Sequence, residues 1–219
     1  MKFLVFLGTV RDSTPPKPAR LGLRVLKACL ACLNTRYIGH EVEFVDALDY
    51  PLDNVFKPHF AYQKGKAPSS LNALAERIES SDGFIMISPE YNHSMSPALM
   101  NLLNHFGSSL FSYKPSAIVT YSAGQWGGMR AAIGMRTFLS ELGCLPVSAM
   151  VHIPKAQEAF AEDGSLILEE EQDSWFNYFD RSFSQLEWWA QASKQHRAEI
   201  NPHGKIMDFK SNPSERNAP

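Results

Sequence analysis

Residues 83–98 read GFIMISPEYNHSMSPA, and this stretch contains one complete unit of the fold. The apolar run at 83–87 has the length and composition of a buried strand, which we expect to stop at Ser88 and Pro89. Ser96 and Pro97 are residue types preferred at the cap and the first turn of a helix, and apolar residues recur after them at helical spacing. The stretch therefore predicts a strand, a loop and a helix, in that order.

The same order recurs along the rest of the chain. Parallel strands need long crossover connections, usually helices, so this alternation predicts an α/β fold: a three-layer, doubly wound sheet of five parallel strands. Ser69 and Ser70 are the expected N-caps of the helix that follows the second strand. The other expected strands are 2–7, 41–45, 117–121 and 147–153, and the other expected helices are 20–33, 129–142 and 169–195.

Length and charge limit the classes of function. The chain has 219 residues, 44% of them hydrophobic, which predicts one domain (1–198) followed by a polar tail (199–219). Its 21 basic and 23 acidic residues give a net charge of -2, which argues against the broad positive surface of nucleic-acid binders. No apolar run has the length of a membrane span, and three cysteines do not form a disulfide framework. We expect a cytoplasmic protein with neither nucleic-acid nor membrane partners.

Ligands of doubly wound sheets bind beyond the carboxyl ends of the strands, so the loop after the first strand is the first candidate. It reads GTVRDSTPPK at 8–17, with a single glycine, and matches neither the dinucleotide-binding nor the Walker pattern. Thr9, Ser13 and Thr14 supply hydroxyl groups and Arg11 a cation, just before a helix N-terminus. These groups suit a phosphate monoester, although an ordinary polar turn is the alternative.

The loop after the third strand reads SPEYNHSMSP at 88–97. Tyr91 offers a flat apolar face with a polar tip, which could lie against an aromatic ring system. Backbone donors of Tyr91, Asn92 and His93 could then reach the heteroatoms of that ring. The alternative is a surface turn in which Tyr91 packs on a neighbour.

The loop after the fourth strand reads SAGQWGG at 122–128. Gly124, Gly127 and Gly128 would allow the backbone to approach a planar ligand closely, and the helix that begins near Met129 would direct its positive end toward it. The alternative is a glycine-rich connection that only permits tight packing.

Thiol, metal and hydrolase chemistry find little support. Cys29 and Cys32 form a C-x-x-C pair, but they fall in the middle of the first expected helix among leucines, which favours buried packing thiols over a redox pair. The seven histidines include no i,i+4 pair and no C-x-x-C companion, so no metal site is expected. The sequence also lacks the G-x-S-x-G elbow of α/β-hydrolases.

Three motifs in this order carry a resemblance. GTxR after the first strand, PEYNHS after the third and SxGxxGG after the fourth resemble the NADPH-dependent FMN reductase family of flavodoxin-like proteins, which includes quinone, azo-dye and chromate reductases. The resemblance covers about residues 1 to 190, and PEYNHS is its specific part. It implies a flavodoxin-like sheet with strand order 2-1-3-4-5.

The resemblance also implies which residues would hold FMN. Thr9 and Arg11 would bind the phosphate, together with one of Ser13, Thr14 and Arg20, because the proline-rich first loop departs from the family pattern there. The second and third motifs would surround the isoalloxazine ring. Pro89, Glu90, Tyr91 and Asn92 would line one side of it, and Ser122, Gly124, Gln125, Gly127 and Gly128 would approach its pyrimidine end.

The activity implied by the resemblance is an NAD(P)H-dependent reductase. Hydride would pass from NADPH or NADH to flavin N5, and the reduced flavin would then reduce a quinone, an azo compound or a similar small acceptor in a ping-pong cycle. The helix end after Gly128 would stabilise the anionic reduced flavin. No side chain is required as an acid or base; His93 is a candidate proton donor, with a structural hydrogen-bonding role as the alternative.

A second class of function stays open from the sequence alone: a non-enzymatic FMN-binding electron carrier or an interaction protein on the same fold. Carriers of this kind tend to be strongly acidic, whereas this chain is nearly neutral. The last expected helix places Trp175, Phe176, Phe179, Phe183, Leu186 and Trp189 along one stripe, with Tyr178 and Trp188 off it. The stripe fits packing on the sheet, and the second apolar face suggests a homodimer or homotetramer, as in the resembled family.

Overall fold

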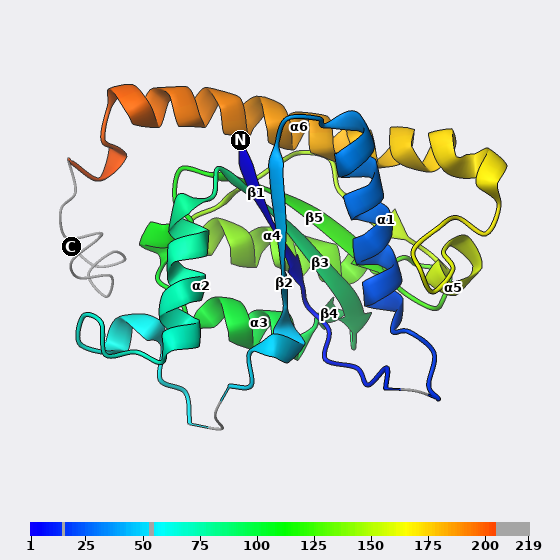
Figure 1. Cartoon of the computed structure of the whole chain (residues 1–219), viewed down its shortest axis with the longest axis horizontal. Helices are drawn as coiled ribbons and strands as arrows, with labels where there is room; N and C mark the ends of the chain where they lie inside the picture. Colours follow the sequence, from blue (N-terminus) through cyan, green and yellow to red (C-terminus); the bar gives the residue numbers. More distant parts are fainter. Residues whose placement is uncertain (15, 53–54, 205–219) are drawn as a thin grey trace.

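A computed structural model describes residues 1–14, 16–52 and 55–204 of the chain. A twisted sheet runs through the middle, with helices on both of its faces (Figure 1). The strands are β1 (Lys2–Leu7), β2 (Glu41–Asp46), β3 (Gly83–Tyr91), β4 (Ser94–Met95), β5 (Pro115–Tyr121), β6 (Leu145–Pro146) and β7 (Val151–Ile153). The α-helices are α1 (Leu21–Arg36), α2 (Ser69–Ser80), α3 (Pro97–Asn104), α4 (Met129–Glu141), α5 (Ala156–Ala159) and α6 (Gln172–Glu199). Short 3₁₀ turns are η1 (Ala47–Asp49), η2 (His59–Ala61), η3 (Ser108–Leu110), η4 (Glu169–Glu171) and η5 (Pro202–Gly204).

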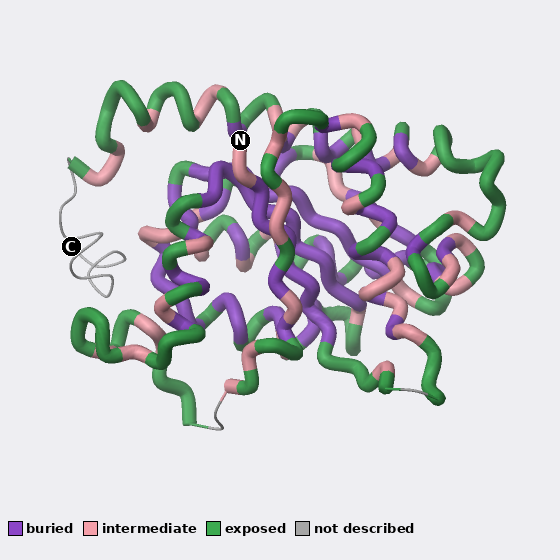
Figure 2. Tube along the Cα trace, viewed as in Figure 1, coloured by how far each residue is buried: buried purple, intermediate pink, exposed green. Residues whose placement is uncertain are grey.

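Alternation along the central strands builds two cores. In β1, Phe3, Val5 and Leu7 pack toward α1 and α6, whereas Leu4 and Phe6 pack toward α2, α3 and α4. Each central strand is therefore apolar at nearly every position, as expected for a sheet covered on both faces. Figure 2 shows the same result, with the buried part of the trace running along the strands and the inner sides of the helices. The three-layer α/β prediction is confirmed.

The strand order also agrees with the flavodoxin-like prediction. The path is β2-β1-β3-β5, and β6 and β7 both pair with β5 at the far edge, where the fifth strand was expected. All of these pairs are parallel; only β4 is antiparallel, beside β3.

The single expected strand at 147–153 is wrong in detail, because the edge strand is split. Pro115 pairs with Leu145, and Val119 pairs with Val151. The edge segment therefore advances six residues between these pairs while β5 advances four, and its two extra residues form a bulge. Side chains satisfy the backbone there: Gln185 Oε1 accepts from the N–H of Ser148 at 3.1 Å.

The third strand is longer than expected. It does not stop at Ser88 and Pro89 but continues to Tyr91 and turns into β4. The carbonyl of Ile87 points to β1, where it accepts from the N–H of Gly8 at 2.9 Å. Because backbone groups two residues apart in a strand point the same way, the backbone of Pro89 also points toward the β1 side, beyond the last paired residue of β1. Its missing N–H therefore removes no ladder bond.

Helix boundaries agree in part. Ser96 caps α3 as predicted, and its hydroxyl accepts from the N–H of Ala98 at 3.1 Å. The N-cap assignment of Ser69 and Ser70 is wrong: Pro68 occupies the cap, so both serines already lie inside α2. The acidic run at 169–171 forms η4 ahead of α6, and α6 continues beyond residue 195 to Glu199.

The tail assigned to 199–219 begins in the last residue of α6, and 205–219 lie outside the described residues, so the division at 198 stays a prediction. Within the part of the chain that the structure describes, no helix has both the length and the hydropathy needed to cross a bilayer.

Candidate cofactor site at the carboxyl edge of the sheet

The three loops singled out in the sequence meet at one cavity of about 590 Å³, at the carboxyl ends of β1, β3 and β5. This is the position at which doubly wound sheets bind ligands. Seven of the predicted residues line it: Thr9, Arg11, Arg20, Pro89, Glu90, Tyr91 and Ser122. Asp12, Lys17, Pro18, Ala19, Leu21, Arg24, Tyr121, Ala123 and Gln157 complete the lining.

The N-terminus of α1 opens toward this cavity. Arg20 is its cap residue, the Arg20 side chain makes no capping hydrogen bond, and the first turn contains no acidic residue. Its unpaired N–H groups and the helix dipole are therefore available to an anion. Gly22 permits this position, because a Cβ there would lie 2.4 Å from Tyr121 Oη and 2.5 Å from Thr9 Cγ2.

Arg11 and Arg20 have different roles around this helix end. Arg11 is exposed on the cavity wall, and within the described residues its guanidinium makes no hydrogen bond or ion pair. Arg20 is buried; its Nη1 donates to the carbonyl of Thr9 at 2.5 Å and its Nη2 pairs with Asp46. Burial lowers the pKa of Arg20. Arg20 thus fastens the first loop to the end of β2, while Arg11 remains available to a ligand.

Ser13 and Thr14 do not line the cavity. They lie in a turn closed by Asp12, whose carboxylate accepts from the N–H of Thr14 at 2.8 Å and from Lys17 Nζ at 2.5 Å. The hydrogen bond from Lys17 holds the pKa of Asp12 well below its usual range. The proline-rich loop therefore presents Lys17 to the cavity and directs the two hydroxyl residues elsewhere.

The PEYN segment forms the second wall. Pro89, Glu90 and Tyr91 line the cavity, whereas Asn92 and His93 form the exposed turn between β3 and β4, with φ of 49° and 63°. Two successive residues with positive φ are typical of a tight hairpin turn. Asn92 and His93 are therefore placed beside the cavity mouth rather than in its lining.

Glu90 joins this wall to α4. Its Oε2 accepts from the backbone N–H of Arg130 at 3.2 Å and of Ala131 at 3.4 Å, and its Oε1 lies 2.7 Å from Arg130 Nη2. The first donors of α4 are thus already occupied by a carboxylate. The helix end after Gly128, expected to face an anionic ring, has its positive charge largely balanced within the protein.

In the third loop only Ser122 and Ala123 reach the cavity. The Ser122 hydroxyl donates to the carbonyl of Gly124 at 2.8 Å and accepts from the N–H of Gly127 at 3.0 Å. Gly128 has φ of 82°, and a Cβ there would lie 2.7 Å from Thr120 Cβ, so glycine is required for packing. Gly124, Gln125, Gly127 and Gly128 shape the loop and stay outside the cavity lining.

The sequence reasoning missed Tyr121 and Gln157. Tyr121 ends β5 at the cavity floor, and burial raises its pKa; its place at the end of an expected strand was the available signal. Gln157 comes from α5, which no sequence pattern indicated. Its Nε2 donates to the carbonyl of Ala123 at 3.0 Å, while its buried Oε1 and the buried Nε of Arg20 have no partner in the described structure. Two unpaired polar atoms beside one cavity favour a polar ligand there.

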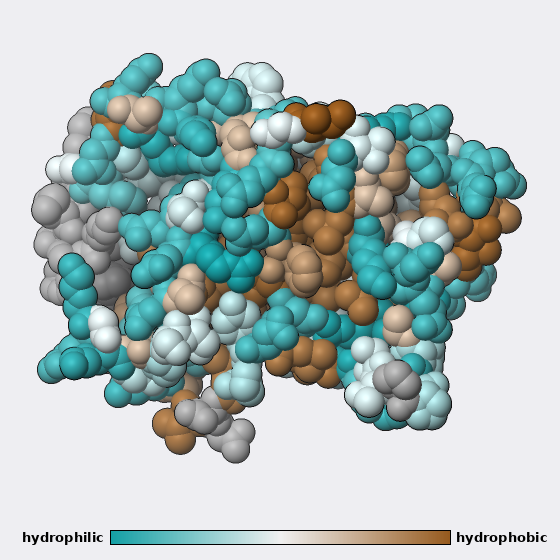
Figure 3. All heavy atoms as spheres, viewed as in Figure 1, coloured by the Kyte–Doolittle hydropathy of each residue, from teal (hydrophilic) through white to brown (hydrophobic). Residues whose placement is uncertain are grey.

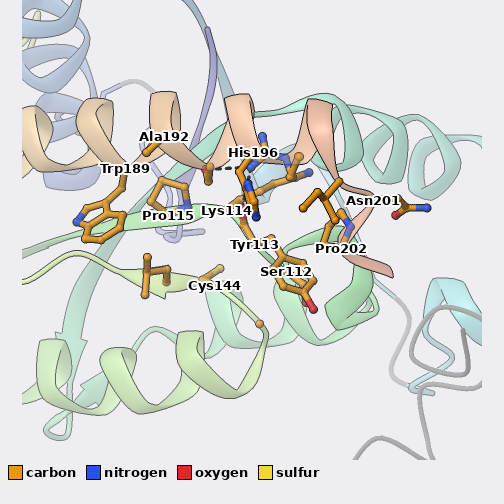
Figure 4. A pocket seen from close by; sticks show the side chains of 15 residues that line it. Ser112, Tyr113, Lys114, Pro115, Cys144, Trp189, Ala192, His196, Asn201 and Pro202 are labelled. Carbon is orange, nitrogen blue, oxygen red and sulfur yellow. Dashed lines mark hydrogen bonds between the residues drawn. The ribbon is translucent and has the colours of Figure 1, made fainter. Parts of the chain in front are cut away.

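The cysteines take no part in this site. Cys29 and Cys32 are buried in the core between α1 and the sheet, as predicted for packing thiols, and burial raises the pKa of Cys32 to about 12. Within the described residues, no three histidine, cysteine or acidic side chains are grouped so as to hold a metal ion. A larger cavity, of about 730 Å³, lies at the opposite edge of the sheet (Figure 4).

Fold and cavity together define a flavodoxin-like α/β protein with a candidate ligand cavity at the carboxyl edge of its sheet. The model of the NADPH-dependent FMN reductase family matches residues 1–158, and the chain belongs to this family. It is accordingly an oxidoreductase that uses FMN and NAD(P)H.

Individual relatives agree with this assignment. An NAD(P)H-dependent FMN reductase of Pseudomonas aeruginosa is 33% identical over 133 residues, which cover 59% of this chain and 69% of that enzyme. A quinone reductase of Escherichia coli is 36% identical over 75 residues, or 33% of this chain and 40% of that enzyme. The solved flavoenzyme NAD(P)H:(acceptor) oxidoreductase of Paracoccus denitrificans has a TM-score of 0.66 at 24% identity, covering 85% of this chain and 97% of that one, and supports the fold.

Proposed function

We propose that the chain binds FMN in the carboxyl-edge cavity, accepts hydride from NADPH or NADH at flavin N5, and then reduces a quinone, an azo compound or a similar small acceptor in a ping-pong cycle. One observation carries the proposal: the N-terminus of α1, with no acidic residue in its first turn, opens into a cavity beside the Arg11 guanidinium, which has no partner among the described residues. That combination suits the phosphate of FMN. The names of relatives, a quinone reductase and an NADPH azoreductase, support this acceptor class.

The residues present fit FMN. Thr9 and Arg11 would hold the phosphate with the N–H groups of α1, and Arg20 would add its unpaired Nε. Ser13 and Thr14 would contribute only after the Asp12 turn opens. Pro89, Glu90 and Tyr91 would line one side of the isoalloxazine ring, and Ser122 would lie toward its pyrimidine end. Asn92 in the adjoining turn, and Gly124, Gln125, Gly127 and Gly128 in the third loop, would reach the ring only from outside this lining.

When bound, FMN supplies the hydride-accepting chemistry, and the chain supplies position and electrostatics. Tyr91 is 38% exposed at the cavity wall, where its ring can cover one face of a planar group. Glu90 fixes the distance between that wall and α4 through its bonds to Arg130 and Ala131. His93 stays a proposed proton donor, from the exposed turn beside Tyr91.

Anaerobic titration tests the proposal. The purified protein should be yellow, NADPH or NADH should bleach it in the absence of acceptor, and a quinone added afterwards should restore the colour. Separation of the two half-reactions in time would establish the ping-pong order. Yellow protein that is indifferent to both nicotinamides would favour the electron-carrier alternative, and colourless protein that takes up no FMN would refute both readings.

We also propose that the chain forms a homodimer or homotetramer in the cytoplasm. On α6 the stripe Phe176, Phe179, Phe183 and Leu186 is buried against the sheet, while Trp188 and Trp189 remain 63% and 42% exposed. Apolar atoms also gather over the middle of the face shown in Figure 3, where β2 and α1 lie, and Phe44 of β2 is 47% exposed. A monomeric mass in light scattering would contradict the oligomer, and recovery of the protein outside the cytoplasmic fraction would contradict the location.

A further inference from the structure

A cavity larger than the one at the cofactor site lies far from it in the fold. It is a space of about 730 Å³ between α6 and the amino ends of β5 and β6. The flavin-binding residues leave this space unused, because they all lie at the carboxyl edge. It therefore calls for a separate explanation.

One end of the cavity is apolar and the other carries basic and polar side chains, as Figure 4 shows. Trp189, Ala192 and Pro115 form one end. Leu145, also in the lining, pairs with Pro115 in the sheet. His196 and Lys114 lie toward the other end, with Asn201 beyond them, and Arg197 belongs to the same lining. No acidic side chain of the described residues lines the cavity.

Lys114 contributes a buried positive charge. Its Nζ donates to three carbonyl oxygens: Ile78 at 2.9 Å, Glu79 at 2.7 Å and Leu110 at 2.9 Å. These bonds use all three of its protons. Its ammonium forms no salt bridge with the described residues, and the carboxylates of Glu79 and Asp82 lie near enough to offset part of its charge. Burial, together with the charge of Arg197, lowers the pKa of Lys114 to about 8.

Arg197 adds a second charge and has donors to spare. Its Nη1 donates to the carbonyl of Tyr113 at 2.7 Å and to Ser193 Oγ at 3.0 Å, and its Nη2 lies 3.2 Å from Asp82. A guanidinium has five N–H donors, so two remain without a named acceptor. Asp82 is shared with Lys194, at 2.8 Å, so one carboxylate serves two cations.

We propose that this cavity is a second small-molecule site, which takes a monoanion with a flat apolar body, such as an aromatic carboxylate. The apolar body would cover Trp189, Pro115 and Leu145, and the carboxylate would accept from the remaining donors of Arg197 and offset the charge of Lys114. Neutral apolar molecules would leave the remaining Arg197 donors without an acceptor. This site and the FMN site do not depend on each other.

A matched pair of fluorescent probes tests the charge requirement. Anilinonaphthalene sulfonate is an apolar monoanion, and N-phenylnaphthylamine has the same ring system without the sulfonate. We expect one anionic probe to bind per chain, at least tenfold more tightly than the neutral one, and naphthoate to displace it. Equal affinity for the two probes would refute the proposal, as would failure of naphthoate to displace the anion or displacement by FMN.

Variants separate the two ends of the cavity. Arg197→Gln should weaken the anionic probe about tenfold and leave the neutral probe unchanged, Arg197→Lys should restore part of the binding, and Arg181→Gln on the same helix should change neither. Leu145→Trp should reduce binding of both probes by filling the cavity while retaining its charges. If Arg197→Gln fails to fold, Leu145→Trp decides alone: unchanged binding of both probes would overturn the assignment.

Discussion

Arg11→Ala removes a side chain that is proposed to bind the phosphate and that the fold does not need. The guanidinium is exposed at the cavity wall and has no hydrogen bond or ion pair within the described residues. A hydrogen bond to a charged group contributes roughly 1.5–3 kcal/mol, so its loss should weaken FMN binding about 10- to 100-fold. The free energy of unfolding of the FMN-free protein should stay within about 0.5 kcal/mol of wild type.

Arg20→Ala provides the contrast. It leaves Asp46, whose side chain is only 13% exposed, without its cation and breaks the bond to the Thr9 carbonyl. Removal of one member of a buried pair costs roughly 3–5 kcal/mol, so this variant should lose stability first and FMN affinity as a consequence. Arg11→Ala should thus lower FMN affinity alone, whereas Arg20→Ala should first lower the free energy of unfolding, although both arginines border the same cavity.

Two measurements on the same preparations decide between these outcomes: FMN titration by flavin fluorescence and urea unfolding of the FMN-free protein. Arg181→Ala, on the outer side of α6, is the matched control and should leave both unchanged. If Arg11→Ala binds FMN as tightly as wild type, Arg11 is not the phosphate cation. If Arg11→Ala instead unfolds at much lower urea, its guanidinium has a structural partner and the reasoning from its exposure fails.

Three further perturbations follow from contacts described above. Glu90→Gln keeps an acceptor for the first N–H groups of α4 but removes the charge that pairs with Arg130; we expect a loss of about 1 kcal/mol in urea unfolding, and no loss would mean that the carboxylate charge is unimportant. Gly22→Ala places a methyl group 2.4 Å from Tyr121 Oη, so it should cost roughly 1–3 kcal/mol by the same assay and weaken FMN binding; wild-type values for both would show that α1 can shift freely. The pKa of Lys114 is lowered from 10.5 to about 8, so between these pH values the unfolded chain binds more protons than the folded one. The free energy of unfolding should therefore rise with pH across that window, by up to about 3 kcal/mol. Lys114→Met should flatten this rise in thermal unfolding, and an unaltered pH profile would contradict the assignment.

The layers and the position of the site could be predicted because each depends on local pattern, whereas the strand order came from the family resemblance. Apolar runs at strand length and helical spacing after them specify the alternation, and the carboxyl-edge rule then places the three loops together. The split of the fifth strand could not be predicted, because its unpaired backbone is satisfied by Gln185, which lies 37 residues further along the chain.

The same limit applies to the charges of the site. Arg20 was one of three alternatives for the phosphate, and its pairing with Asp46, 26 residues away, commits it to the fold. Glu90 was expected beside the ring, and its bond to Arg130, 40 residues away, occupies the end of α4. Composition shows that such charges exist, but only the tertiary structure shows which of them are already neutralised.

Burial of the three cysteines protects them from the peroxide that flavin chemistry can produce. Reduced flavins pass electrons to dissolved oxygen, and the peroxide formed attacks thiolates rather than thiols. Cys29, Cys32 and Cys144 are all of the cysteines in the chain, and all three are buried, with pKa values raised by burial. Oxidation of its thiols should therefore be slow while the protein stays folded.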